Sequence, residues 1–253
     1  MSGAKPILSV RGLVKNFGGL LATDHIDFDL APGEVHAVIG PNGAGKTTFL
    51  SQLAGELRPD EGRISFGDKD ITHMPVPDRA RAGVGRSYQI SQVFRDMTAL
   101  ENVLLAVQAT EASSFSFLAS VFDDEKLVEA ARGYLRLCGL AAREETLVSV
   151  LAHGEHRQLE LAMTLATRPR VLLLDEPMAG MSQAESVEMI KLLKEVKRHY
   201  AVVLVEHDMD AVFSLADRIS VLVYGRVLVT GTPGQIRENE LVKEAYLGDQ
   251  EEE

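Results

Sequence analysis

The sequence predicts an α/β fold with three parts: a mainly parallel sheet carrying a phosphate loop, an antiparallel β layer and an inserted group of helices. Three observations predict it. The stretch GPNGAGKTT, residues 40–48, follows a short apolar run and precedes a helical pattern, which is the order strand, loop, helix. Apolar runs at residues 171–174 and 201–205 alternate with helical patterns, as in parallel βα units. Between residues 98 and 167 the pattern is mainly helical.

Composition and charge narrow the class of protein. The chain has 253 residues, 45% of them hydrophobic, which suits one large α/β domain with a sizeable core. Its formal net charge of −11 argues against nucleic acid as the main partner, because no basic excess is available to neutralise phosphates. The one cysteine, Cys138, excludes an internal disulfide and is expected to pack among leucines. No apolar stretch resembles a signal peptide or a membrane span, so we expect a soluble protein.

The chain before the helical part is expected to form β structure around the phosphate loop. Residues 7–10 and 63–66 show short strand patterns. Residues 25–30 alternate polar and apolar side chains, as a half-buried strand does, and residues 35–39 form an apolar run that predicts a buried strand. Phe17 lies in a glycine-flanked turn, where its ring either stacks on a nucleotide base or packs in the core.

The glycine-rich stretch itself fits the pattern G-x-x-x-x-G-K-[ST] at all fixed positions. Glycines let the backbone approach phosphate oxygens, and the following helix N-terminus adds partial positive charge. Lys46 supplies a full charge for the outer phosphates, Thr47 a hydroxyl for Mg²⁺, and Thr48 a second hydroxyl at a phosphate. A glycine-rich turn with a chance lysine is the weaker alternative. The residues expected to line the phosphates are Gly40, Pro41, Asn42, Gly43, Ala44, Gly45, Lys46, Thr47 and Thr48.

The helical part begins with a capping box, Thr98-x-x-Glu101, which predicts a helix start. Residues 123–137 and 151–167 have helical periodicity, whereas residues 110–121 predict a loop or frayed helix. The βα alternation then returns. The expected elements are helices at residues 183–198 and 209–216, strands at residues 218–223 and 226–229, and a short helix after residue 234.

Polar residues follow two of the predicted buried strands. Asp175 and Glu176 end the first, and Glu206 and His207 end the second. In open parallel sheets ligands bind at the carboxyl ends of the strands, so these side chains are expected beside the phosphate loop. We assign Asp175 to Mg²⁺ through water, Glu176 to the general base and His207 to the γ-phosphate of a phosphoryl-transfer site. The alternative is solvated charge after a strand, and for His207 a surface histidine.

Taken together, these motifs resemble ABC-transporter ATP-binding cassettes over nearly the whole chain. Residues 40–48 resemble Walker A, and VLLLDEP, residues 171–177, resembles Walker B with its catalytic glutamate. Gln89 lies where the family has its Q-loop glutamine, His207 where it has its switch histidine, and Phe17 where it has the aromatic that stacks on the base. The resemblance implies ATP and Mg²⁺ as cofactors. The expected magnesium ligands are then Thr47, Gln89 and, through water, Asp175.

The resemblance also implies a second nucleotide-contacting element, at the position of the family's LSGGQ signature. In such cassettes two subunits pair head to tail, and the signature of one covers ATP bound by the other. The residues implied for this contact in trans are Leu151, Ala152, His153, Gly154 and Glu155. Ala152 and His153 replace the usual serine and first glycine, so backbone contacts from Gly154, or help from His153, are expected to compensate. Ser182 replaces the usual D-loop aspartate and, with Glu185, forms a capping box.

The resemblance predicts one cassette over residues 1–253. Residues 1–97 plus 168–253 would form the nucleotide-binding core with its β layer, and residues 98–167 the helical subdomain carrying the signature. The implied partners are a second ATP-binding subunit, identical or not, integral membrane permease subunits and, indirectly, an extracytoplasmic substrate-binding protein. The implied location is peripheral, at the cytoplasmic face of the membrane.

Details of the motifs are similar to the larger type of ATPase subunit that energises branched-chain amino acid uptake. They are Phe17-Gly18-Gly19, the signature form Leu-Ala-x-Gly, residues 175–181, residues 205–209 and the ending Ala245-Tyr246-Leu247-Gly248. Related cassettes for urea or amide uptake or lipopolysaccharide export stay open, because the transported substrate never touches this subunit. A soluble ABC ATPase that clamps nucleic acid or ribosomes, and a phosphate-loop kinase, are the weaker alternatives.

Overall fold

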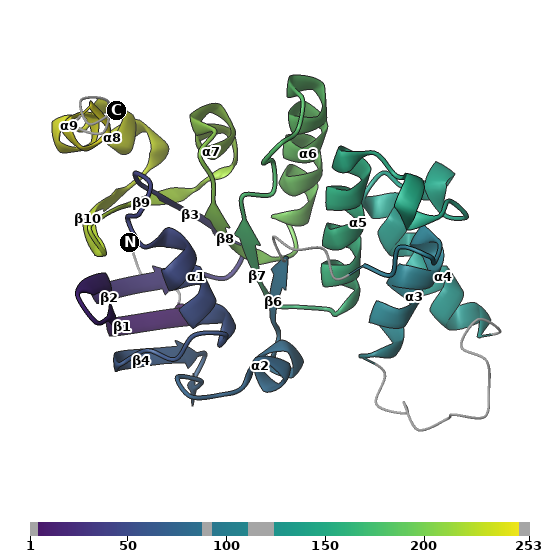
Figure 1. Cartoon of the computed structure of the whole chain (residues 1–253), viewed down its shortest axis with the longest axis horizontal. Helices are drawn as coiled ribbons and strands as arrows, with labels where there is room; N and C mark the ends of the chain where they lie inside the picture. Colours follow the sequence, from purple (N-terminus) through teal and green to yellow (C-terminus); the bar gives the residue numbers. More distant parts are fainter. Residues whose placement is uncertain (1–4, 88–92, 111–123, 248–253) are drawn as a thin grey trace.

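The computed structural model describes residues 5–87, 93–110 and 124–247, and these form two sheets with helices around them (Figure 1). The smaller sheet is antiparallel, in the order β2-β1-β4-β5. Its strands are β1 (Leu8–Phe17), β2 (Leu20–Leu30), β4 (Glu61–Phe66) and β5 (Lys69–Asp70). β1 and β2 are longer than predicted, because register shifts between them interrupt the alternation that marks a strand in sequence.

The larger sheet has the order β10-β9-β3-β8-β7-β6 and is parallel except for the antiparallel pair β9–β10. Its strands are β3 (Val35–Ile39), β6 (Val84–Ser87), β7 (Val171–Asp175), β8 (Ala201–Val205), β9 (Arg218–Val223) and β10 (Arg226–Gly231). The predicted α/β class is therefore confirmed. The prediction missed β6, because a four-residue strand containing Gly85 and Arg86 has no apolar pattern.

The predicted helices are present, with small shifts at their ends. The helices are α1 (Lys46–Ala54), α2 (Val76–Ala82), α3 (Ala99–Gln108), α4 (Glu125–Leu137), α5 (His153–Ala166), α6 (Gln183–Val196), α7 (Met209–Leu215), α8 (Pro233–Glu238) and α9 (Glu240–Leu247), with 3₁₀ turns at Ala141–Arg143 and Val148–Val150. The Thr98 capping box starts α3 as predicted. Most of the predicted loop at residues 110–121 lies outside the described residues.

Helix α2 was not predicted, because its short sequence begins among the prolines at residues 75 and 77, which are also common in loops. Pro75 is instead the N-cap and Pro77 lies in the first turn. A proline there loses no helical hydrogen bond, since the first N–H groups of a helix have no partner within the helix. Prolines at this point of the sequence therefore mark the start of a helix.

Both faces of the larger sheet are covered, which explains its uninterrupted apolar strands. Along β7, Leu172 and Leu174 pack into a core shared with α3 to α7, whereas Val171 and Leu173 face a second core between the two sheets. Helix α1 lies in that second core through Phe49 and neighbouring apolar side chains. The fold therefore places α1 and α5 on opposite faces of the same sheet. Cys138 is buried, as predicted.

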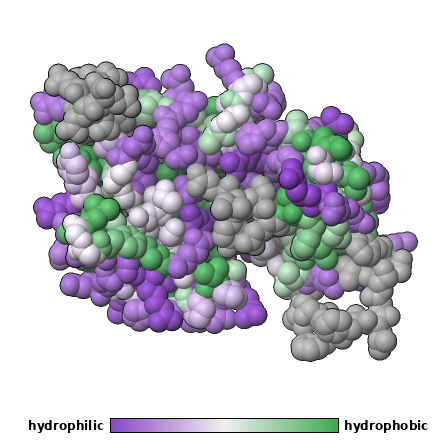
Figure 2. All heavy atoms as spheres, in the orientation of Figure 1, coloured by the Kyte–Doolittle hydropathy of each residue, from purple (hydrophilic) through white to green (hydrophobic). Residues whose placement is uncertain are grey.

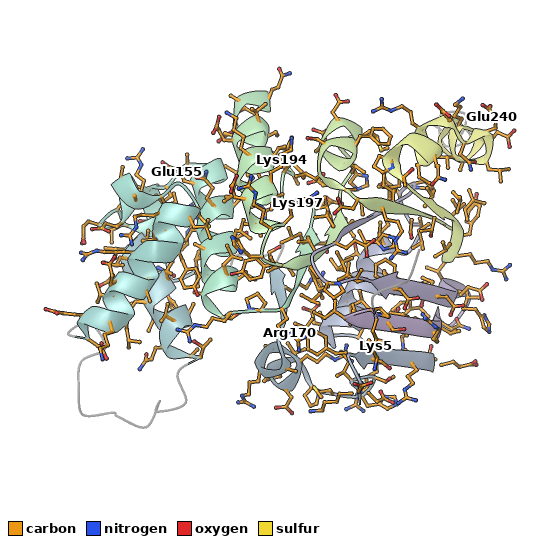
Figure 3. The ribbon with its side chains drawn as sticks, turned by 180° about the vertical axis from the view of Figure 1, so that it is seen from behind. Lys5, Glu155, Arg170, Lys194, Lys197 and Glu240 are labelled. Atoms are coloured by element: carbon orange, nitrogen blue, oxygen red, sulfur yellow. The ribbon has the colours of Figure 1, made fainter. Side chains whose placement is uncertain are left out.

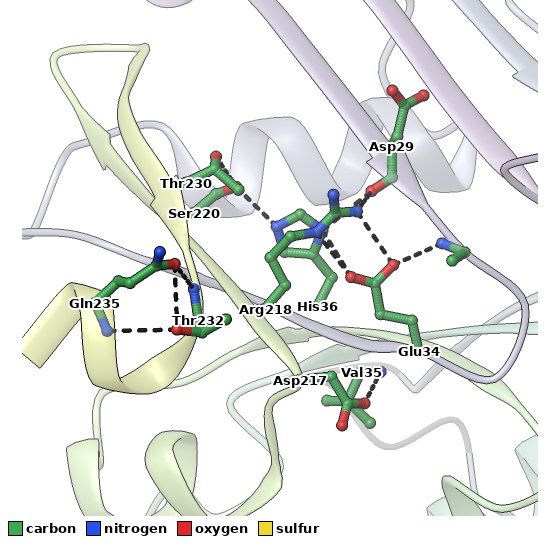
Figure 4. Close-up of polar contacts among 11 residues, drawn as sticks. Asp29, Glu34, Val35, His36, Asp217, Arg218, Ser220, Thr230, Thr232 and Gln235 are labelled. Carbon is green, nitrogen blue, oxygen red and sulfur yellow. Dashed lines mark hydrogen bonds and ion pairs between the residues drawn. The ribbon is translucent and has the colours of Figure 1, made fainter. Parts of the chain in front are cut away.

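A buried polar chain joins the two sheets at His36, on β3 (Figure 4). His36 Nδ1 donates to the carbonyl oxygen of Asp29 at 3.0 Å, since a carbonyl only accepts. Its Nε2 therefore accepts from Ser220 Oγ at 2.8 Å, and Ser220 bonds Thr230 at 2.7 Å. The imidazole ring lies 4.2 Å from that of Phe28. Burial lowers the pKa of His36 to about 3, so the folded protein holds it neutral.

We expect this histidine to make the protein less stable in mild acid. The unfolded chain takes up a proton at His36 below its ordinary pKa of 6.5, and the folded chain does so only near 3. The free energy of unfolding therefore falls as pH drops below 6.5, by about 2 kcal/mol at pH 5. Urea denaturation between pH 7 and pH 5 measures it. In His36→Gln the free energy of unfolding should depend less steeply on pH. His199→Gln, at an exposed site, is the control and should keep the original pH dependence. Equal slopes for His36→Gln and the parent protein would contradict the assignment.

Candidate functional site

The predicted site residues converge at one edge of the larger sheet. Gly40 follows β3, Asp175 ends β7 and Glu206 follows β8. These three strands are neighbours and parallel, in the order β3-β8-β7, so their carboxyl ends lie side by side. The predicted grouping of phosphate loop, carboxylates and histidine at one sheet edge is therefore the arrangement that the fold has.

Two glycines of the phosphate loop are required by close backbone contacts. A Cβ at Gly40 would lie 2.0 Å from the carbonyl oxygen of Leu222, and one at Gly45 would lie 2.1 Å from that of Ala22. Gly43 has open space around it but a φ of 77°, in the left-handed region that favours glycine. The loop is thus held between β9 and β2 in a shape that other residues cannot adopt.

The inner side of the loop presents positive charge. Lys46 is buried, and its ammonium donates to the carbonyl oxygens of Gly40 at 2.6 Å and Pro41 at 2.8 Å. No side chain caps the start of α1, and its first turn contains no acidic residue. The N–H groups of this turn can therefore bind an anion. Thr47 and Thr48, exposed and half-buried, lie in that first turn.

Asp175 is a buried carboxylate with one oxygen in use. Its Oδ2 accepts from Arg86 Nη2 at 2.7 Å, whereas no hydrogen bond of the described residues reaches its buried Oδ1. Burial raises the pKa of Asp175, against the effect of the Arg86 cation. An unpartnered carboxylate oxygen beside a phosphate loop fits a metal-bound water, so Asp175 and the Thr47 hydroxyl are suited to hold Mg²⁺.

Glu176 and His207 form a hydrogen-bonded pair. Glu176 Oε1 lies 2.7 Å from His207 Nε2, and both side chains are partly exposed. Glu176 has a φ of 48°, a conformation that is rare for residues other than glycine. Its N–H donates to Val205 O on β8 at 2.9 Å, which holds the carboxylate at the junction of two strands. A carboxylate so placed can accept a proton from water while the histidine fixes its orientation.

Glu206 has a structural role that the sequence analysis did not assign. It is buried, and its carboxylate accepts from the N–H groups of Met178 at 2.9 Å and His207 at 3.0 Å. Burial raises its pKa, against these hydrogen bonds. Glu206 thus joins the end of β8 to the loop that follows Glu176. An acidic residue directly after a fully apolar strand was the signal that could have identified it.

Arg86 is the other functional residue that sequence reasoning missed, because β6 itself was not predicted. Of the remaining predicted residues, Phe17 ends β1 and is 51% exposed, with the Lys15 ammonium 5.5 Å from its ring centroid. The interpretation of Phe17 as a core residue is therefore wrong, and the ring is free to stack on a ligand. Gln89 lies outside the described residues.

The signature region starts α5, and an acidic residue caps it. Glu155 accepts from the N–H of Ala152 at 2.9 Å and from Arg143 Nε at 2.7 Å. These two donors lower the pKa of Glu155, against the effect of burial. Figure 3 shows Glu155 on the helical side of the molecule. The phosphate loop leads into α1, on the opposite face of the sheet from α5.

The loop after Glu176 packs against the signature. Ser182 and Glu185 form the predicted capping box at the start of α6. A Cβ at Gly154 would lie 2.6 Å from Glu185 Oε1, which is the end of a flexible side chain, so Glu185 and Gly154 are close neighbours. His153 Nε2 lies 3.2 Å from the carbonyl oxygen of Ala179. The start of α5 therefore lies against the loop after Glu176 and the start of α6 within one chain.

The fold and the site together define an ATP-binding cassette ATPase. The fold has an antiparallel layer and added helices, and the carboxyl edge of its larger sheet presents a phosphate loop, a buried aspartate and a glutamate–histidine pair. The chain belongs to this family: the model described as "ABC transporter" matches residues 23–179. A second model, "Branched-chain amino acid ATP-binding cassette transporter", matches residues 226–252. Proteins of this family bind nucleotide and hydrolyse ATP, and the chain is such an enzyme.

Individual relatives and solved structures indicate which kinds of ABC ATPase this chain resembles. The high-affinity branched-chain amino acid transport ATP-binding protein LivG of Escherichia coli (strain K12) is 40% identical over 253 residues, covering 97% of this chain and 99% of LivG. The lipopolysaccharide export system ATP-binding protein LptB of Acidithiobacillus ferridurans is 34% identical, covering 96% and 98%. The ADP conformation of MJ1267, an ATP-binding cassette of an ABC transporter, superposes with a TM-score of 0.86 at 28% identity, covering 97% and 100%.

The contact between Gly45 and Ala22 gives a testable prediction. Gly45→Ala should abolish nucleotide binding, because the added Cβ cannot fit against the carbonyl oxygen of Ala22. Gly67→Ala is the matched control: it also has a positive φ, costing about 1–2 kcal/mol of backbone strain, but it lies in open space and not beside Phe17. Fluorescence titration with a labelled ADP and thermal melting compare the two variants. Tight binding by Gly45→Ala would show that the loop tolerates displacement.

Proposed function

We propose that this chain is the ATP-binding subunit of an ABC importer that hydrolyses MgATP between two such subunits to drive amino acid uptake through separate membrane subunits. Branched-chain amino acids are the favoured substrates, supported by the name of the LivG relative and by the family model over residues 226–252. The observation that carries the catalytic part is the Glu176–His207 pair, 2.7 Å apart, at the same sheet edge as Asp175 and the phosphate loop.

Different residues of the chain have different roles at this site. Residues 40–48 bind the phosphates, and Phe17 stacks on the base. Thr47, Asp175 through water, and Gln89 would hold Mg²⁺, and the ion would supply charge neutralisation at the phosphate oxygens. Glu176 accepts the proton of the attacking water, and His207 keeps the Glu176 carboxylate in place and contacts the γ-phosphate.

A second subunit is needed because the signature and the phosphate loop of one chain lie on opposite faces of the sheet. We propose that residues 151–155 contact ATP held by the partner, chiefly through backbone N–H groups at the start of α5. Ala152 lacks the hydroxyl, and Ser182 the carboxylate, that the family usually has at these positions. The two ATP sites of a heterodimer would therefore differ in strength. In this division of the chain, residues 98–167 act as a helical subdomain on a core of residues 1–97 and 168–253.

The membrane subunits are proposed to dock in an apolar groove between the core and the helices. The groove has a volume of 230 Å³ and lies between α1, α2 and β6 on one side and α3 and α5 on the other. Its apolar lining includes Val76, Val84, Val93, Ala106 and Met163. Apolar side chains are also visible over the helical part in Figure 2. None of the helices in residues 5–87, 93–110 and 124–247 is long and apolar enough to cross a membrane. Docking would place the subunit peripherally, at the cytoplasmic face.

Lipopolysaccharide export is the second candidate function, supported by the 34% identity with LptB. The 40% identity with LivG and the match of residues 226–252 favour amino acid uptake. Membrane vesicles containing this chain with candidate permease subunits and an extracytoplasmic binding protein distinguish the two. ATP-dependent accumulation of radiolabelled leucine supports import, and ATP hydrolysis stimulated by a lipopolysaccharide permease instead would overturn it.

The base assignment predicts the effect of one substitution. Glu176→Gln should lower ATP turnover at least about 100-fold, because the amide cannot accept the proton, and should leave ATP affinity intact. Gel filtration with ATP should then show an accumulated dimer. Glu195→Gln is the control, since Glu195 is an exposed residue of α6 paired with Arg198. Full hydrolysis by Glu176→Gln would remove Glu176 from the base role.

The docking groove makes a separate prediction. Met163→Glu places a charge in the apolar lining and should abolish co-purification with the membrane subunits, while ATP binding by the purified chain persists. Leu241→Glu, at an exposed apolar position of α9, is the control and should co-purify normally. Co-purification that depends on RNA would favour a nucleic-acid or ribosome clamp and contradict the transport assignment.

A further inference from the structure

Arg86 occupies an unusual position among the buried residues of the site edge. Its side chain is only 8% exposed and lies between two carboxylates. Nη2 donates to Asp175 Oδ2 at 2.7 Å, while Nη1 donates to Glu56 Oε2 at 2.5 Å and to Ser51 Oγ at 2.9 Å. One guanidinium therefore reaches three acceptors, which its planar fork permits and a lysine ammonium on a flexible stem does not match.

Asp175 depends on this contact for its orientation. Its side chain is 1% exposed, and among the described residues the hydrogen bond from Arg86 is the one that reaches its carboxylate. Because Arg86 binds Oδ2, the other oxygen, Oδ1, keeps its lone pairs for a further donor. Without Arg86 the carboxylate would have nothing in this part of the chain to fix its rotation about the Cβ–Cγ bond.

Arg86 also joins two parts of the site that are far apart in the sequence. It lies on β6 opposite Leu173 of β7, two residues before Asp175. Ser51 belongs to α1, the helix whose first turn contains Thr47, and Glu56 follows its end. The guanidinium therefore connects the helix that offers one magnesium ligand with the strand that offers another.

The two carboxylates that pair with Arg86 leave a net negative charge, which attracts a metal ion. Glu56 and Asp175 together carry two negative charges and Arg86 carries one positive charge. Because Glu56 pairs with the other edge of the guanidinium, Arg86 does not neutralise Asp175 alone. The cluster keeps a net negative charge at the sheet edge, next to the phosphate loop.

We infer that Arg86 is a positioning residue for the metal–nucleotide complex: it fixes the Asp175 carboxylate so that Oδ1 receives a metal-bound water. The inference rests on the proposed assignment of Asp175 to magnesium. Arg86 itself touches neither nucleotide nor metal in this arrangement. Partners that orient metal ligands typically contribute about 10- to 100-fold to metal affinity.

The test measures metal affinity directly, apart from ATP turnover. Mn²⁺, a paramagnetic substitute for Mg²⁺, is titrated by EPR into the full chain saturated with ADP. Arg86→Gln is expected to raise the Mn²⁺ dissociation constant about 10- to 100-fold, and Arg86→Lys, which keeps the positive charge but loses the guanidinium fork, to give an intermediate value. The exposed Arg81→Gln is the matched control and should leave the Mn²⁺ affinity unchanged. If Arg86→Gln does not fold, as circular dichroism will show, Arg86→Lys decides the test.

Asp175→Asn separates failure of this inference from failure of the site assignment. The double variant Arg86→Gln/Asp175→Asn should bind Mn²⁺ no more weakly than Asp175→Asn alone, since Arg86 acts through that carboxylate. If Asp175→Asn weakens Mn²⁺ binding and the Arg86 variants do not, Arg86 has no positioning role. Tighter binding by Arg86→Gln would show that the arginine competes with the ion, which also overturns the inference. An unchanged affinity in Asp175→Asn would instead reject the magnesium assignment.

Discussion

Close contact between backbones shapes the phosphate loop, and the rest of the site depends on that shape. The carbonyl oxygens of Leu222 on β9 and Ala22 on β2 lie where a side chain at Gly40 or Gly45 would begin. One carbonyl belongs to the larger sheet and the other to the smaller sheet. The loop therefore takes its form only when both sheets are assembled, which explains why the antiparallel layer is needed for the phosphate loop.

The parts of the fold that were predictable are those whose sequence pattern has a single physical cause. Strands β3, β7 and β8 are fully buried and mostly apolar because both sheet faces are covered, and the capping boxes at Thr98 and Ser182 satisfy helix N–H groups locally. Strand β6 could not be recognised, since its residues serve close packing and an ion pair. Helix α2 was missed because its prolines fit a helix start as well as a loop.

The site likewise has parts that could be predicted from the sequence and parts that could not. The phosphate loop was predictable because its residues are consecutive in the sequence. The residues at the strand ends were predictable because each directly follows a buried strand of a parallel sheet. Arg86 was not, because its partners lie 30, 35 and 89 positions away and only the sheet order brings them together. The role of Glu206 depends on a loop after the neighbouring strand, and the proposed contact in trans would depend on another chain. The partners in such contacts cannot be identified from a local pattern, even where the residue itself follows an apolar strand, as Glu206 does.

The placement of α1 and α5 on opposite faces of one sheet has a consequence for the pair of subunits. In a head-to-tail dimer each chain gives its loop to one nucleotide and its signature helix to the other, so each closed ATP site draws on both chains. A dimer of one chain with a defective loop and one with a defective signature would contain one intact site and one doubly damaged site. Inherited defects in the two elements could therefore complement each other, which gives genetics a way to detect the pairing without any structure of the complex.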